Sequence, residues 1–171
     1  MAEWSRRAAR RPARGGLPNA LFVVAAAERP PAELAGIADE LTINFPWGSL
    51  LAGTLAIDPA VAAGIASLVA SGGRMRGLVS VLDDDRLGLP PLATDDAHVL
   101  AERWACHGLE LSSFRPATQA EVDQSRSSWA RRLAAGRRRP TCRIELVKAS
   151  GARAGGAPAG TDAVASARPS G

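Results

Sequence analysis

The chain has 171 residues, of which 46% are hydrophobic and 4% aromatic, and its formal net charge is +4. This length and apolar content fit one globular domain with a real core, and no apolar run is long enough to span a membrane. A basic balance is typical of proteins that contact nucleic acid, but arginine supplies almost all of it, and the bias of a GC-rich genome accounts for part of the charge.

The cysteines and the N-terminus indicate a cytoplasmic protein. Cys106 and Cys142 are far apart and lack the spacing of a zinc site, so we expect both to be reduced. The N-terminal arginines are not followed by the apolar segment of a secretory signal. We expect a monomer that holds no metal and contacts no membrane.

The first half of the chain alternates between helix and strand signals. LFVVAAA at residues 21–27 is a continuous apolar run bounded by turn residues, as in a strand buried on both faces. LTINF at 41–45 alternates apolar and polar residues before the turn PWG. In order, we expect a helix over 2–14, a strand over 21–27, a helical turn over 32–38, a strand over 41–45, a helix over 49–55, and a helix over 58–70 that Asp58 caps and Ser71-Gly72-Gly73 ends.

The second half continues this alternation. Glu121 follows Thr118 by three residues, which is the pattern of a capping box at the start of a helix. Asp83-Asp84-Asp85 is expected to form a solvated loop, because three consecutive carboxylates cannot all face one metal ion. In order, we expect a strand over 74–82, a helix over 95–106 capped by Thr94, a strand over 109–114, a helix over 119–125, a short helix within 127–139, a strand over 142–147 and a disordered tail over 149–171.

Strands that alternate with helices predict an α/β fold with a parallel sheet between two helix layers. The carboxyl ends of such strands share one edge, and ligands bind there. Glu28, Trp47 and the acidic loop would lie on that edge.

Two tryptophans lie in patterns that favour contact with a base. Trp47 follows a strand and precedes a helix, so an exposed indole there would suit stacking, and the alternative is a tryptophan that caps the core. Trp129 is followed by five arginines within ten residues, which favours a stacked base with neighbouring phosphates; the alternative is a solvated basic helix face. Glu28 is either an acceptor for an adenine amino group or ribose hydroxyl, or an ordinary loop carboxylate.

The blocks FVVAAAE, FPWGSLL and SSFRPAT…SRSSWARRL follow one another in this order. Together they resemble the aminoglycoside-resistance 16S rRNA (adenine-N1)-methyltransferases of the kanamycin–apramycin type, which modify the decoding-site adenine at position 1408. The resemblance covers about Ala2 to Val147. It implies a class I S-adenosylmethionine-dependent methyltransferase fold, which is Rossmann-like with an antiparallel last strand, over residues 1–148.

The resemblance also implies roles for individual residues. Trp47 and Trp129 would hold the flipped adenine between them. The residues that would contact the cofactor, S-adenosylmethionine, are Ala27, Glu28, Asn44, Phe45, Pro46, Ser49 and Ser127. Those that would grip rRNA phosphates are Arg132, Arg137 and Arg139. Methyl transfer needs mainly the positioning of N1, so no general base is expected.

The sequence departs from the family pattern before residues 21–27. The family begins with a strand, a Gly-rich loop and a second strand, which this sequence lacks, so the expected fold lacks the first two strands. In the family's sheet those strands lie between the strands expected at 21–27 and 41–45, and residues 21–27 would lack a neighbour to pair with. We therefore expect this chain to be a fragment, inactive alone, of an enzyme that methylates N1 of that adenine in the 30S subunit and gives aminoglycoside resistance. The alternatives are a non-catalytic RNA-binding remnant and the unstable product of a decayed gene.

Overall fold

A computed structural model of the protein describes residue 10, residues 12–17 and 19–81, residue 92, and residues 94–132 and 139–150. The expected helix over 2–14 lies largely outside these residues, and its described end is the short 3-10 helix η1 (Pro12–Arg14). The acidic loop Asp83-Asp84-Asp85, Arg137 and most of the expected tail also lie outside the described residues.

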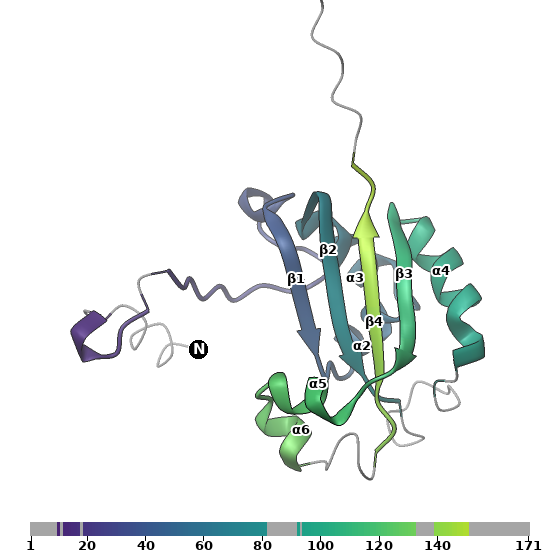
Figure 1. The fold of residues 1–171 in the computed structure, drawn as a ribbon. Helices are drawn as coiled ribbons and strands as arrows, with labels where there is room; N and C mark the ends of the chain where they lie inside the picture. Colours follow the sequence, from purple (N-terminus) through teal and green to yellow (C-terminus); the bar gives the residue numbers. More distant parts are fainter. Residues whose placement is uncertain are drawn as a thin grey trace, which may run out of the picture.

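Four strands form one sheet in the order β1-β2-β4-β3 (Figure 1). They are β1 (Ala38–Asn44), β2 (Val69–Val79), β3 (Leu109–Pro116) and β4 (Cys142–Lys148). β1 and β2 are parallel, and β4 is antiparallel to both of its neighbours. The α/β class and the antiparallel last strand are confirmed. The all-parallel sheet that alternation alone predicts is wrong, because β3 and β4 pair directly and an antiparallel pair needs no crossover helix.

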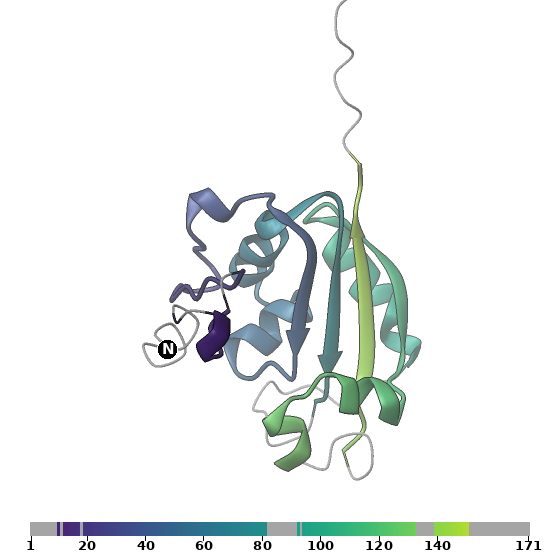
Figure 2. The ribbon, with the colours of Figure 1, turned by 60° about the vertical axis from the view of Figure 1, so that its left-hand side comes forward.

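Three helices cover one face of the sheet (Figures 1 and 2). They are α2 (Ser49–Thr54), α3 (Pro59–Leu68) and α4 (Ala97–Ala105). Their apolar residues pack on the inward side chains of the strands, and Trp104, Leu51 and Ile144 are fully buried in this main core. Asp58 caps α3 as expected, since its carboxylate accepts from the backbone N–H of Ala60 at 3.0 Å. Among the described helices, none is long and apolar enough to cross a membrane.

Two short helices, α5 (Gln119–Gln124) and α6 (Ser128–Arg132), lie at the end of the sheet toward which β1 and β2 run (Figure 1). The predicted capping box of α5 is confirmed, because Thr118 Oγ1 accepts from the Glu121 N–H at 3.3 Å and the Glu121 carboxylate accepts from the Thr118 N–H at 2.8 Å. The helical turn expected over 32–38 is the 3-10 helix η2 (Ala32–Leu34). Thr94 begins a further 3-10 helix, η4 (Thr94–Asp96), so the residue that precedes α4 is Asp96 rather than Thr94.

Residues 21–27 do not form the expected strand. They run as extended chain outside the sheet with one isolated bridge, between Ala26 and Arg29, and Leu21 and Val24 are 81% and 80% exposed. A strand is stable only where a neighbouring strand completes its backbone hydrogen bonds, and in the sheet order β1-β2-β4-β3 this segment pairs with neither edge strand. An apolar run alone therefore does not make a strand here.

The strand expected over 74–82 begins earlier than predicted. α3 ends at Leu68 and β2 starts at Val69, so Ser71-Gly72-Gly73 lies inside the strand instead of ending a helix. The register between β1 and β2 is irregular there, and a Cβ at Gly73 would lie 2.8 Å from the Ala38 carbonyl oxygen. Gly73 therefore permits a close approach of β1 and β2, which is a common reason for a glycine inside a strand.

Candidate functional site

The turn after β1 is held in strained backbone. Phe45 directly follows Asn44, the last residue of the strand, and has φ 52, in the left-handed region that bulky residues rarely adopt. Its N–H donates to the Leu78 carbonyl of β2 at 2.7 Å, and its side chain is buried. Backbone strain of this kind costs about 1–3 kcal/mol and is concentrated at functional sites. Gly48, with φ 59, then turns the chain into α2.

Trp47 stands out from this turn. Its side chain is 71% exposed, although indole is one of the most apolar groups in the chain. The alternative in which this tryptophan caps the core does not fit such exposure. Pro46 beside it is half-buried, and Ser49 is an exposed first residue of α2. The end of β1 and the turn that follows it therefore present the side-chain amide of Asn44, the indole of Trp47 and the hydroxyl of Ser49.

A small second core joins this turn to the β3–β4 connection. Phe45, Leu78, Val122 and Ala130 are buried together, and Val122 belongs to α5 while Ala130 belongs to α6. Phe45 lies two residues before Trp47, and Ala130 directly follows Trp129. One patch of core thus brings together the two tryptophan-bearing segments, which lie far apart in the sequence.

The start of α6 is capped by Ser127. Its hydroxyl oxygen accepts from the Ala130 N–H at 3.2 Å, and a hydroxyl that accepts in this way can still donate its own proton. Trp129 lies in the first turn of α6, where the structure describes its backbone. Arg132 is exposed at the end of the same helix. Ser127, Trp129 and Arg132 therefore share one short element.

Arg139 is bound to the protein itself. Its Nε donates to Ser80 Oγ at 2.7 Å and its Nη2 donates to the Ser80 carbonyl at 3.1 Å. These bonds tie the chain that enters β4 to the residue that follows β2. A contact between Arg139 and rRNA phosphate stays a prediction, and a phosphate would have to compete with Ser80. The contact predicted for Arg137 lies outside the described residues.

Ala27 and Glu28 lie against α3 and not at the end of a strand. A Cβ at Gly64 would lie 1.9 Å from the Ala27 carbonyl oxygen, so the backbone of this segment packs directly on the helix. Ala27 is half-buried against the main core, and Glu28 is exposed. Of the rim that we expected from aligned strand ends, the structure places Trp47 after β1, while Ala27 and Glu28 contact the domain through α3 and the acidic loop lies outside the described residues.

Two arginines that the sequence analysis missed anchor α5. Arg115 of β3 donates to both carboxylate oxygens of Glu121, at 3.0 and 2.5 Å, and Arg143 of β4 donates to one of them at 2.8 Å. The hydrogen bonds from Arg115 are the main cause that lowers the pKa of Glu121 to about 2. The alternating pattern CRIELVK was a usable signal, because it places Arg143 and Glu145 on the polar face of β4.

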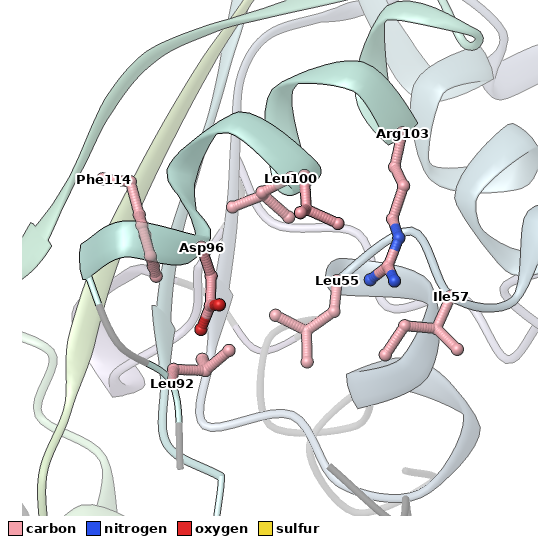
Figure 3. Close-up of a pocket in the computed structure, with 8 residues that line it drawn as sticks. Leu55, Ile57, Leu92, Asp96, Leu100, Arg103 and Phe114 are labelled. Carbon is pink, nitrogen blue, oxygen red and sulfur yellow. The ribbon is translucent and has the colours of Figure 1, made fainter. Parts of the chain in front are cut away.

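Two cavities lie near these elements. A polar one of about 230 Å³ lies between the sheet and α5, where Asn44, Leu78, Glu121 and Arg143 are among the lining residues. An apolar one of about 110 Å³ lies between α4 and the end of α2 (Figure 3). None of the expected site residues lines the apolar cavity.

The groups after β1 fit one side of a nucleoside site. Such a ligand needs an aromatic or apolar wall and a few amide or hydroxyl groups that fix its orientation. Asn44, Pro46 and Ser49 supply these groups at an exposed strand end, and Ser127 supplies a further hydroxyl from the segment joined through the second core.

The chain matches known proteins along most of its length. A family model described as NpmA, 16S rRNA (adenine(1408)-N(1))-methyltransferase, matches residues 1–148. The 16S rRNA (adenine(1408)-N(1))-methyltransferase of Escherichia coli is 34% identical over 151 residues, which cover 82% of this chain and 68% of that protein. The enzyme of the same name from Streptoalloteichus tenebrarius is 37% identical over 145 residues, which cover 81% of this chain and 66% of the relative. The chain thus spans about two thirds of the length of these relatives.

Solved structures agree with these matches. The antibiotic-resistance methyltransferase Kmr superposes with a TM-score of 0.71 at 35% identity, over 89% of this chain and 72% of that one. A 16S rRNA (adenine(1408)-N(1))-methyltransferase variant from Catenulisporales acidiphilia, solved with cosubstrate SAM, gives a TM-score of 0.77 at 30% identity, over 88% and 71% of the two chains. The family match, the curated relatives and the superpositions together show that the chain belongs to the 16S rRNA (adenine(1408)-N(1))-methyltransferase family.

Proposed function

We propose that this chain takes part in methyl transfer from S-adenosylmethionine to N1 of adenine 1408 of 16S rRNA in the 30S subunit, in the cytoplasm, with aminoglycoside resistance as the result. The observation that carries the proposal is the second core of Phe45, Leu78, Val122 and Ala130, which joins the two tryptophan-bearing segments. Its family relatives carry this activity in their names.

The chain's own residues would position the base. When bound, the cofactor would supply an electrophilic methyl group: the N1 lone pair of adenine would form the new bond to carbon while the bond from carbon to sulfur breaks, and the sulfur would leave with that electron pair as a neutral thioether. Trp47 and Trp129 would stack on the two faces of an adenine turned out of its helix. Because the methylated base carries a positive charge, two indole faces would also stabilise the product side of the reaction.

Polar groups near the tryptophans would hold the other reactant. Asn44, Ser49 and Ser127 offer hydrogen bonds, with Phe45 and Pro46 as an apolar wall. Arg132 would contact rRNA phosphate from the exposed end of α6. Ala27 and Glu28 lie in the segment that packs on α3. They would contact the cofactor either from this place or after a movement of the segment.

Methylation of isolated 30S subunits tests this function. A methyl group on N1 blocks base pairing, so a chain that methylates by itself should stop primer extension at adenine 1408 after incubation with the cofactor, whereas no stop would agree with the fragment, inactive alone, that we expected from the sequence. Trp47→Ala should remove the stop, while Phe22→Ala changes an aromatic residue outside the tryptophan turns and should leave it. Full activity of Trp47→Ala, or a stop at another nucleotide, would contradict the proposed site.

A second candidate function is RNA binding without methyl transfer. The position of residues 21–27 outside the sheet favours it. Ala27 at the end of this segment and Glu28 next to it are expected cofactor contacts, and neither lies at the end of a strand. The chain would then bind rRNA in a salt-dependent way, and Arg132→Ala would weaken binding and reduce the salt slope by about one. Calorimetry with S-adenosylmethionine separates the two functions, since heat of binding supports the enzyme and its absence supports the binding protein.

A further inference from the structure

The face of the sheet opposite α2, α3 and α4 carries a continuous chain of ion pairs. It begins at β1, crosses β2 and β4, and passes through Glu121 of α5 to Arg115 of β3. Its pairs are Glu40–Arg76 at 3.1 Å, Arg76–Glu145 at 3.6 Å, Arg143–Glu145, Arg143–Glu121 at 2.8 Å and Arg115–Glu121 at 2.5 Å. Glu121 is the member of this chain that lies on α5 and not on a strand.

Glu121 is also the most buried carboxylate of these pairs. Its side chain is 16% exposed, against 46% for Glu40 and 31% for Glu145. Besides the two arginines, it accepts from the N–H and the hydroxyl of Thr118, at 2.8 and 3.1 Å. One side chain therefore fixes the start of α5 to both β3 and β4.

The helix that Glu121 anchors cannot hold its own position. α5 has six residues, and helices of this length are not stable by themselves in water. Val122, the next residue, is buried against Ala130 of α6 and Phe45 of the β1 turn. A change in the ionic anchor of α5 is thus passed on through Val122 to the helix that carries Trp129.

We propose that Glu121 is a positioning residue, which through Arg115, Arg143 and the adjacent Val122 sets where α6 presents Trp129 and Ser127. The inference rests on the proposed methyl transfer for its effect on activity. It goes beyond that function because it assigns part of the positioning of Trp129 relative to Trp47 to ion pairs on the face of the sheet. As a positioning residue, Glu121 acts only through other residues and not by contact with substrate.

The test compares the full chain with Glu121→Gln and with a matched control, Glu110→Gln, which neutralises an exposed carboxylate of β3. Glutamine keeps an acceptor for the capping box and removes the charge. Hydrogen exchange of the amides of α6 should speed up in Glu121→Gln by about tenfold more than exchange in β2, which reports the loss of global stability. In 30S methylation, kcat should fall about tenfold while KM for the 30S subunit stays within about twofold, because misplaced stacking affects the reacting geometry more than docking.

The outcomes separate this inference from the proposed function. Faster exchange in α6 together with the loss of kcat supports both. Faster exchange in α6 with a wild type that does not methylate supports the positioning role and shows that the chain alone does not carry out the proposed reaction. Exchange in α6 that speeds up no more than exchange in β2, or a fall in activity that matches the unfolded fraction, overturns the positioning role, as does an equal effect of Glu110→Gln.

Discussion

Replacing Glu121 by glutamine should reduce the stability of the fold to an extent that depends on pH. The guanidinium of Arg115 is the main cause that lowers the pKa of this carboxyl from its ordinary 4.5 to about 2. A carboxylate whose pKa falls on folding stabilises the native state above its unfolded pKa, and the stabilisation is lost as pH falls toward the folded pKa. The shift corresponds to about 3 kcal/mol at neutral pH. Because Arg115 is 43% exposed and water screens the pair, we expect about 1–2 kcal/mol.

Urea unfolding of the wild type and Glu121→Gln at neutral pH, pH 5 and pH 3 measures this difference. The free-energy gap should be close to its full size at pH 5, fall by more than half by about pH 3, and become small near pH 2, where the native carboxyl is about half protonated. Glu110→Gln, which removes an exposed carboxylate of β3, is unfolded under the same conditions as the control. A gap that is absent at neutral pH, or equally large at pH 3, would refute the reasoning from the arginine contacts.

Three further changes test the packing that positions the site. Gly64→Ala would place a Cβ 1.9 Å from the Ala27 carbonyl oxygen, so it should speed hydrogen exchange at residues 26–29 and cost about 1–3 kcal/mol in urea unfolding. Trp104→Phe removes the indole donor to the Thr54 carbonyl, now 3.2 Å away, from a fully buried position, and should cost about 2 kcal/mol of unfolding free energy by thermal or urea melts. Asp58→Ala removes the cap of α3 and should cost about 1 kcal/mol, whereas Asp58→Ser should recover most of it; equal losses would contradict the capping role.

Features that depend on neighbouring residues could be predicted from the sequence. The capping box of Thr118 and Glu121 and the cap formed by Asp58 involve atoms within three residues of each other, so their chemistry can be read directly. β1, β3 and β4 follow the alternation of apolar and polar residues, which is a property of a single strand. For Trp47 the sequence left two alternatives, an exposed indole and one that caps the core, and its 71% exposure fits the first.

Features that depend on a distant partner could not be predicted in this way. The apolar run at 21–27 reads as a strand, and whether it is one depends on hydrogen bonds that another strand must offer. Ser71-Gly72-Gly73 reads as a helix end, yet the glycines serve the close approach of β1 and β2 near Ala38. The arginines that anchor Glu121 come from β3 and β4, and only the order of these strands brings them to one carboxylate.

The second core explains why the two tryptophan segments depend on each other. Phe45 adopts a backbone conformation that costs free energy, and nothing within its own turn offsets that cost. The offset comes from burial of its ring against Leu78, Val122 and Ala130, three residues that follow it in the chain. α6 in turn is a single short turn that gains its place from the same contact. Neither the exposed indole of Trp47 nor the helix that carries Trp129 is therefore fixed by local sequence alone, and a substitution in one segment should be felt in the other.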